Sequence, residues 1–366
     1  MGDNPLILLS SIIKQFKTDF FAQYQNQALP SHRKALSDME VCRTSHSPKM
    51  LVDCLACDHQ TYIPHSCGHR NCPHCQSHES QLWLERQFKK QVPAKYFLLT
   101  FTLPSAFRSL AWHHQRTLYT SMIKCGWETL RQFSQNDKQL MGTPGAIAVL
   151  HTHKRNLGYH PHVHLIMPAA ALDLTQRLWH TKKNKKQKSY LFNQTALAIV
   201  FRAKLLEAMT QEGLALPAKY PEAWVVHCKS VGSGQKALTY LGKYLYRGVI
   251  QEKDIVACKN GKVTYRYTEG KTGDVEFRTV TGAQFLWLIV QHVLPKGFRR
   301  ARNFGFLHPN SKRLIQLLQF LCKFDPTKLL AATKRPQLTC RCCGAPMVVI
   351  KTRIFPEYSD KTVRTT

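Results

Sequence analysis

The composition of this chain points to a polyanionic partner. Its 366 residues are enough for two or three domains, and 43% of them are hydrophobic, so the chain can bury a core. Lys and Arg number 52 against 22 Asp and Glu, a formal net charge of +30 that favours nucleic acid or an anionic membrane. The longest apolar run, Phe285 to Val290, is too short to cross a membrane, so nucleic acid is the expected partner.

The N-terminal stretch MGDNPLILLSSIIK is expected to begin a helix rather than a signal peptide, because Asp3 precedes its apolar part and no basic start is present. We therefore expect a cytoplasmic protein that acts at the nucleoid. Thirteen cysteines in such a compartment favour metal binding or free thiols over disulfides.

The first 40 residues are amphipathic and predict helical structure, and cysteines then crowd the chain up to Cys75. A helix is expected through SQLWLERQFKKQV. From residue 96 the pattern predicts the order β-α-β-β-α-β-α, with strands at 96–103, 145–153, 160–167 and 223–230 and helices at 108–134, 192–213 and 235–250. This order predicts an α+β fold, an antiparallel sheet with helices on one face.

Two more strands are expected at 263–269 and 275–280, followed by a helix at 284–294 and an Arg-rich segment with interleaved Phe. The predicted organisation is a helical segment (1–40), a zinc-binding domain (41–80), the catalytic core (90–250), a helical DNA-contacting C-terminal region (251–330) and a basic tail with one C-x-x-C pair (331–366).

Two C-x-x-C pairs, Cys54 with Cys57 and Cys72 with Cys75, have the spacing of a zinc ribbon. We expect these four thiolates to hold a structural Zn²⁺. Five further residues lie near them and could replace a ligand or form a second site: Cys42, His46, Cys67, His69 and His74. The tail sequence CRCC contains a further pair, Cys340 with Cys343; because no second pair follows it, a site there would need distant ligands.

A row of histidines lies on one face of the strand HPHVHLIM, because alternate residues of a strand share a face. If the preceding turn centres near Asn156 and Leu157, His151 lies opposite His162 on the neighbouring strand. His151, His162 and His164 could then converge on one catalytic cation with open positions for substrate oxygens. His160 and His153 are alternatives for the third ligand, and a solvated polar face is the structural alternative.

The helix after VGSG carries Tyr240 and Tyr244, which share a face at positions i and i+4. A tyrosine can attack a phosphodiester as a covalent nucleophile. The structural alternative is an aromatic stripe packed into the core.

Together these stretches resemble the HUH single-strand endonucleases, and more narrowly the IS91-type transposases. The resemblance rests on SCGHRNCPHCQ, YFLLTFTLP, YHPHVHLIMP, ALTYLGKYLYRGVI, FLWLIVQHVLPKGF and ARNFGFLH, in that order along the chain. It implies a ferredoxin- or palm-like HUH core in which His162 and His164 bind Mg²⁺ or Mn²⁺. It also implies that Tyr240 and Tyr244 cut one DNA strand to a 5′-phosphotyrosine and a free 3′-OH, in rolling-circle-like transposition.

The expected partner is single-stranded DNA at transposon ends and target, without a membrane or a small-molecule cofactor. A basic loop from Lys182 to Lys188 and the segment FRRAR are expected to contact phosphates, with Phe298 and Phe304 stacking on bases. The candidate DNA-binding residues are Lys182, Lys183, Lys185, Lys186, Lys243, Arg247, Arg299, Arg300 and Arg302.

Two other functions remain open from the sequence. HPHVHLI also fits the histidine-triad nucleotide hydrolases apart from Pro161, although that fold needs neither a zinc module nor this charge. A non-catalytic zinc-ribbon DNA-binding protein would explain the charge and the cysteines but not the histidine row or the tyrosine pair.

Overall fold

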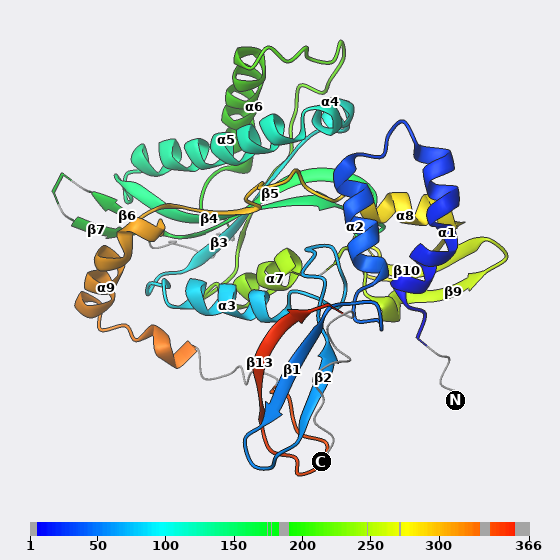
Figure 1. The fold of residues 1–366 in the computed structure, drawn as a ribbon. Helices are drawn as coiled ribbons and strands as arrows, with labels where there is room; N and C mark the ends of the chain where they lie inside the picture. Colours follow the sequence, from blue (N-terminus) through cyan, green and yellow to red (C-terminus); the bar gives the residue numbers. More distant parts are fainter. Residues whose placement is uncertain are drawn as a thin grey trace.

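A seven-stranded antiparallel sheet lies at the centre of the molecule (Figure 1). The computed structural model describes residues 6–173, 175–176, 178–182, 190–246, 248–270, 272–329 and 337–355. The strand order is β7-β6-β4-β5-β3-β8, and β12 also pairs with β4 beyond the end of β6. The strands are β3 (Tyr96–Thr102), β4 (Thr143–His153), β5 (Tyr159–Pro168), β6 (Ala170–Asp173), β7 (Leu178–Thr181), β8 (Val226–Ser230) and β12 (Ala301–Gly305).

Helices cover both faces of this sheet, so the predicted α+β antiparallel architecture is confirmed but the single helical layer is not (Figure 1). On one face lie α4 (Arg108–His113), α5 (Gln115–Gln135) and α6 (Gln194–Gln211). The other face packs against α3 (Ser77–Phe88), α7 (Gln235–Tyr246) and α9 (Lys312–Leu321). The reason is visible in β4, which is buried on both faces from Pro144 to Thr152 and so needs two covering layers.

A second hydrophobic core joins the N-terminal helices to residues of the segment 251–330. Helices α1 (Leu9–Tyr24) and α2 (Pro30–Glu40) pack against α8 (Gly282–Val290) and the sheet of β9 (Ile255–Lys259), β10 (Lys262–Thr268) and β11 (Val275–Thr281). The rings of Tyr24 and Trp287 stack with centroids 4.8 Å apart. The segments 1–40 and 251–330, separate in the prediction, therefore share one hydrophobic cluster.

A third unit is a three-stranded sheet, β13-β1-β2, that projects from the body (Figure 1). Strands β1 (Lys49–Cys54) and β2 (Gln60–Pro64) form a hairpin, and β13 (Met347–Ile354) pairs antiparallel with β1. The prediction of a separate basic tail after residue 330 is thus wrong for residues 337–355, which fold onto the cysteine-rich module. Short 3₁₀ turns complete the described elements: η1 (Ser105–Phe107), η2 (Glu252–Asp254), η3 (Pro309–Ser311) and η4 (Pro326–Leu329).

Among the described helices, none combines the length and apolar character that spanning a bilayer requires.

Gly305 permits the edge strand β12 to lie against β4. Its φ is +57°, and a Cβ at this position would lie 1.7 Å from the carbonyl oxygen of Pro144. We predict that Gly305→Ala lowers the free energy of unfolding by about 3 kcal/mol, from the left-handed backbone and the clash together. Gly213, at φ +70° with open space around it, is the matched control, and Gly213→Ala should cost only about 1 kcal/mol. Equal losses in urea unfolding would contradict the close approach at Gly305.

Candidate functional site

The β4–β5 hairpin brings the predicted histidines together. Its register pairs His151 with His162 and Val149 with His164, as the sequence predicted for the first pair. Leu157 occupies the turn with φ +66°. Its carbonyl accepts hydrogen bonds from Gln291 Nε2 (2.9 Å) and lies 3.0 Å from His292 Nε2, so residues just after α8 hold the turn in place.

Three imidazoles converge on the α7 side of the sheet. One ligand nitrogen from each of His151, His162 and His164 lies within 4.8 Å of the others. His162 Nδ1 bonds to the carbonyl of His160 (2.7 Å) and His164 Nδ1 to Thr100 Oγ1 (2.9 Å). Among the described residues, Nε2 of neither ring has a hydrogen-bond partner. His151 Nε2 is buried without a hydrogen-bond partner in the described structure. Such oriented rings with unused nitrogens fit a divalent cation.

Burial keeps these rings in the form that binds metals. Desolvation lowers the pKa of His162 to about 4 and that of His164 to about 3. The pKa of His151 also lies well below its ordinary value, because burial and the neighbouring His164 and His162 disfavour its charge. All three imidazoles are therefore neutral near pH 7, and each retains a lone pair for a metal.

The two tyrosines of α7 face the histidines but differ in environment. The Tyr244 ring stacks on His151 with centroids 3.3 Å apart, and its hydroxyl lies 2.8 Å from His153 Nδ1. Tyr240 lies one turn earlier, 53% exposed, with its ring centroid 6.4 Å from that of His151. One phenol is thus packed inside the centre and the other is open to solvent, a difference that the spacing alone does not reveal.

Close packing between α3 and α7 sets the position of the tyrosines. A Cβ on Gly242, midway between Tyr240 and Tyr244 in the sequence, would lie 2.7 Å from Leu84 Cγ of α3. Ser80 Oγ, also on α3, donates to the Gly242 carbonyl (2.9 Å). The glycine of ALTYLGKY therefore serves helix–helix contact.

Arg300 reaches the same centre from the segment that precedes β12. Its Nε donates to the Leu150 carbonyl (3.0 Å), and its guanidinium lies 5.1 Å from the Tyr244 ring centroid. Burial raises the pKa of Tyr244, and Arg300 opposes that rise. The sequence prediction placed Arg300 on a DNA-contacting surface; instead it is buried beside Tyr244, where its charge favours an anionic oxygen.

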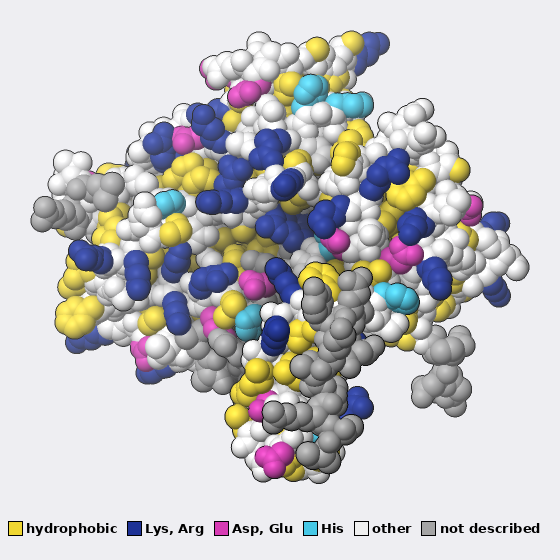
Figure 2. Space-filling model, viewed as in Figure 1, with side chains coloured by type: hydrophobic (Ala, Val, Ile, Leu, Met, Phe, Trp, Pro, Cys, Tyr) yellow, Lys and Arg dark blue, Asp and Glu magenta, His cyan; other side chains and the backbone are white. Residues whose placement is uncertain are grey.

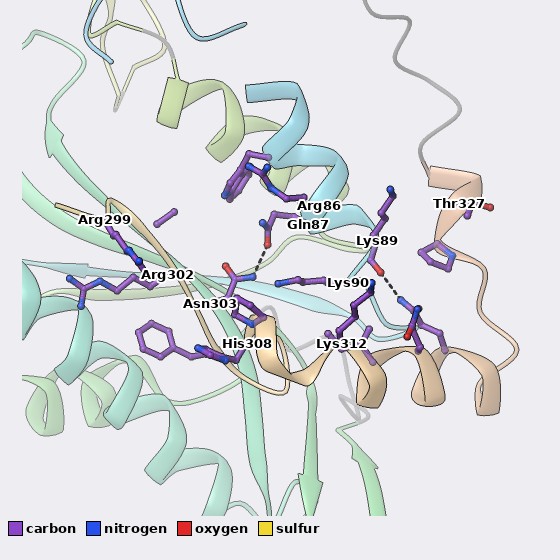
Figure 3. A pocket seen from close by; sticks show the side chains of 18 residues that line it. Arg86, Gln87, Lys89, Lys90, Arg299, Arg302, Asn303, His308, Lys312 and Thr327 are labelled. Atoms are coloured by element: carbon purple, nitrogen blue, oxygen red, sulfur yellow. Dashed lines mark hydrogen bonds between the residues drawn. The ribbon is translucent and has the colours of Figure 1, made fainter. Parts of the chain in front are cut away.

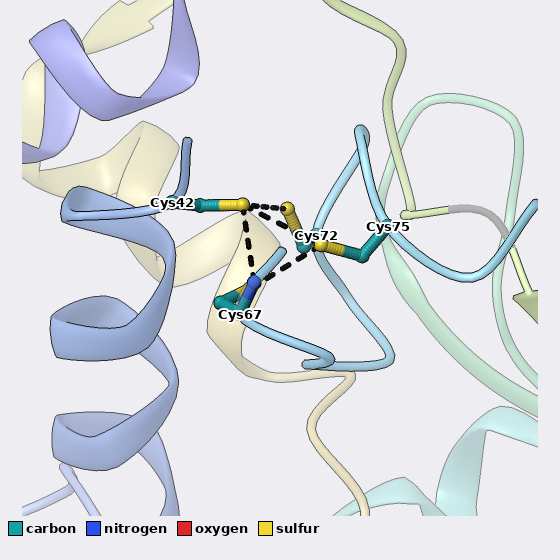
Figure 4. Close-up of side chains that lie close together, drawn as sticks. All are labelled: Cys42, Cys67, Cys72 and Cys75. Carbon is teal, nitrogen blue, oxygen red and sulfur yellow. Dashed lines mark hydrogen bonds between the residues drawn. The ribbon is translucent and has the colours of Figure 1, made fainter. Parts of the chain in front are cut away.

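A group of four cysteines lies where the chain enters α3 (Figure 4). The Sγ atoms of Cys42 and Cys75 are 3.4 Å apart, those of Cys42 and Cys72 3.5 Å, and those of Cys67 and Cys75 3.6 Å. Four sulfurs bound to Zn²⁺ at about 2.3 Å in a tetrahedron are about 3.8 Å apart, and the observed S–S distances are close to this value. All thirteen cysteines are free of disulfides, so the four thiols fit a Zn²⁺ ion.

The cysteine grouping differs from the predicted one. Cys72 and Cys75 join Cys42 and Cys67, which the sequence offered only as alternatives. Cys54 and Cys57 lie instead against the C-terminal segment, because the β1–β2 hairpin carries them away from α3. The regular pair spacing suggested one ribbon, whereas the group beside α3 is completed by two cysteines outside any C-x-x-C pair, Cys42 just after α2 and Cys67.

A groove of about 1070 Å³ with basic walls runs along α3, β12 and α9 (Figure 3). Asn303 Nδ2 donates to Gln87 Oε1 (2.8 Å), and Gln319 Nε2 donates to the Lys89 carbonyl (3.0 Å), so side-chain bonds tie the three elements together. Its described lining includes no Asp or Glu. Lys and Arg side chains border a hollow across this face in Figure 2; the cationic lining residues are Arg86, Lys89, Lys90, Arg299, Arg302 and Lys312.

The other predicted DNA contacts have mixed outcomes. Arg299 and Arg302 line the groove, whereas Lys182 pairs with Asp137 and bonds to the Leu191 carbonyl. Phe298 is buried, whereas Phe304 stacks on Trp127 and also lines the groove. The remaining expected contacts lie outside the described residues or side chains: Lys183, Lys185, Lys186, Lys243 and Arg247.

Known protein families match both the cysteine-rich N-terminal part of the chain and the part that carries the histidines and tyrosines. Residues 12–103 match a family model described as "Transposase zinc-binding domain", and residues 145–314 match one described as "Putative transposase". The protein "Putative transposase y4qJ" of Sinorhizobium fredii is 28% identical over 323 residues, which cover 82% of this chain and 80% of that protein.

A second relative is the "Transposase for insertion sequence element IS801" of Pseudomonas savastanoi pv. phaseolicola, 27% identical over 266 residues. The alignment covers 69% of this chain and 64% of the relative. The two family models between them include the histidine hairpin, the tyrosine helix and the cysteine group beside α3. The chain therefore belongs to the IS91-type transposases that carry a zinc-binding domain.

Proposed function

We propose that this transposase cuts and rejoins single-stranded DNA through 5′-phosphotyrosine links, as HUH endonucleases do, and so moves an insertion sequence by a rolling-circle-like route. The observation that carries the proposal is the convergence of His151, His162 and His164 within 4.8 Å beside a pair of helical tyrosines. A zinc-ribbon protein that only binds DNA would need neither feature.

His151, His162 and His164 are the residues that would hold a divalent ion. Mg²⁺ or Mn²⁺ suits the site because its remaining ligands would be phosphate oxygens, and the bound ion would polarise the scissile phosphate. The bonds from His162 to His160 and from His164 to Thr100 orient the two rings toward that position.

Tyr240 is the first nucleophile in this proposal because its ring is exposed, whereas the Tyr244 hydroxyl is engaged by His153. The phenol oxygen loses its proton and attacks phosphorus, so that an Oη–P bond forms. The P–O3′ bond breaks, and the leaving oxygen takes a proton to become a free 3′-OH. Attack of a 3′-OH on the phosphotyrosine reverses the step and rejoins a strand.

Tyr244 is the nucleophile for the second strand transfer. Its hydroxyl would have to leave His153, and the nearby Arg300 guanidinium would stabilise the phenolate or the phosphate attached to it. Two phenols one helical turn apart can then hold one strand while another is attacked.

We further propose that the basic groove guides the DNA strand toward this centre. Arg299, which lines the groove, is the chain neighbour of Arg300, whose guanidinium lies 5.1 Å from the Tyr244 ring centroid. Cationic walls without acidic residues fit a phosphodiester backbone.

We predict that His162→Ala and His164→Ala each reduce cleavage of a single-stranded oligonucleotide by more than about 100-fold, since each removes a metal-binding ring. His160→Ala is the matched control: His160 lies on the same strand face, its side chain contacts Arg108, and its backbone carbonyl, which the substitution keeps, bonds to His162. Cleavage assays with added Mg²⁺ or Mn²⁺ measure this. Full activity after chelation, in protein shown to remain folded, would rule out the metal.

The tyrosines are tested by denaturing gels that retain protein–DNA adducts. Phenylalanine keeps the packing of the ring but lacks the attacking oxygen. Tyr240→Phe should therefore abolish the first adduct, whereas Tyr244→Phe should permit it but block complete transposition. The double variant should form no adduct. Tyr246→Phe is the control and should remain active. An undiminished adduct in the double variant would remove the proposed nucleophiles.

The groove is tested by the salt dependence of binding. Lys89→Gln with Lys312→Gln should lower the slope of log affinity against log salt by about 1.4, because each lost phosphate contact to a single strand changes it by about 0.7. Lys259→Gln with Lys262→Gln removes the same charge from exposed positions on β9 and β10, far from the groove, and should leave the slope unchanged. Equal effects of the two pairs would indicate that only net charge matters.

A further inference from the structure

The fold brings the C-terminal pair Cys340 and Cys343 next to Cys54 and Cys57. The four Sγ atoms all lie within 4.8 Å of one another in a group formed by Cys54, Cys57, Cys340 and Cys343. The Sγ atoms of Cys54 and Cys343 are 3.4 Å apart, and those of Cys57 and Cys340 are 3.8 Å apart. We propose that these four residues form a second tetrathiolate Zn²⁺ site, built from both ends of the described chain.

Both C-x-x-C turns are shaped to present thiolates. The backbone N–H of Ala56 points at Cys54 Sγ (3.4 Å), and that of Cys342 at Cys340 Sγ (3.4 Å). Each N–H donates to the first sulfur of its pair and stabilises the negative charge that zinc ligation needs. Gly344, at φ +73°, ends the second turn. The two turns are thus equivalent halves of one tetrahedral centre.

The sheet that carries these turns lacks a core of its own. None of the described residues in β1, β2 and β13 belongs to the three hydrophobic clusters, and Val349 and Ile350 of β13 are 45% and 56% exposed. The buried apolar side chains of the two paired strands are few, among them Val52 of β1 and Ile354 of β13. A unit this small is commonly stabilised by a metal, whose binding energy becomes folding energy.

The second site is distinct from the cysteine group beside α3. The family matches cover residues 12–103 and 145–314, so neither includes Cys340 or Cys343. The site also does not depend on the catalytic proposal. Its consequence is topological: zinc ties residues 337–355 to the N-terminal module, and a chain ending before Cys340 would keep only two of the four ligands.

The test is the zinc content of the full-length protein purified under reducing conditions. Elemental analysis should give two Zn²⁺ per chain, falling to one in Cys340→Ser with Cys343→Ser and to one in Cys42→Ser with Cys75→Ser. Far-UV circular dichroism verifies that the chain remains folded. In the Cys340/Cys343 variant alone, limited proteolysis should release the segment after residue 336.

Cys342→Ser is the matched control because Cys342 is exposed and lies between the proposed ligands. It should retain two Zn²⁺. Loss of one from this variant would contradict the ligand set, since His59, Cys340 and Cys342 also lie close together. One Zn²⁺ in the intact protein, unchanged by Cys340→Ser with Cys343→Ser, would overturn the proposal, as would a Cys54–Cys343 disulfide found by mass spectrometry of the freshly purified protein.

Discussion

The register between β4 and β5 is the constraint on which the candidate centre depends. It pairs His151 with His162, and a slip of one residue would exchange the two faces of β5. Val163 and Leu165 would then lose their places in the core under α5, and the histidines would take them. The hairpin turn is held by Gln291 and His292 just after α8, so the core formed by α1, α2 and α8 helps to hold the histidine hairpin in place.

Burial and helix packing bring the histidines, Tyr244 and Arg300 into one centre. Desolvation keeps the imidazoles neutral, and the Tyr244 ring contacts both His151 and the Arg300 guanidinium. The helix bearing Tyr244 is positioned by α3 through the contact of Gly242 with Leu84. Because α3 begins directly after Cys75, the cysteine group beside it anchors the helix that sets the tyrosines. A structural zinc can therefore influence a centre to which it contributes no ligand.

Local patterns made the core predictable from the sequence. Alternation along β5 and the i, i+4 spacing of Tyr240 and Tyr244 depend only on neighbouring residues, so the histidine face and the tyrosine pair could be located. Long-range contacts could not be read in this way. The partnership of Cys54 with Cys343 spans most of the chain, and so does the pairing of β1 with β13. The burial of Arg300 follows from the docking of β12 on β4. Regular C-x-x-C spacing instead suggested the wrong grouping.

The central claim is that the tyrosines facing the histidine centre form the covalent link to DNA, and peptide mapping of the trapped adduct tests it most directly. Trypsin cleaves after Lys236, Lys243 and Arg247, so Tyr240 and Tyr244 fall in separate peptides, ALTYLGK and YLYR. After the wild-type protein has reacted with a single-stranded oligonucleotide and nuclease has trimmed the DNA, mass spectrometry should find a nucleotide on ALTYLGK. An adduct whose nucleotide lies on neither peptide would contradict the account.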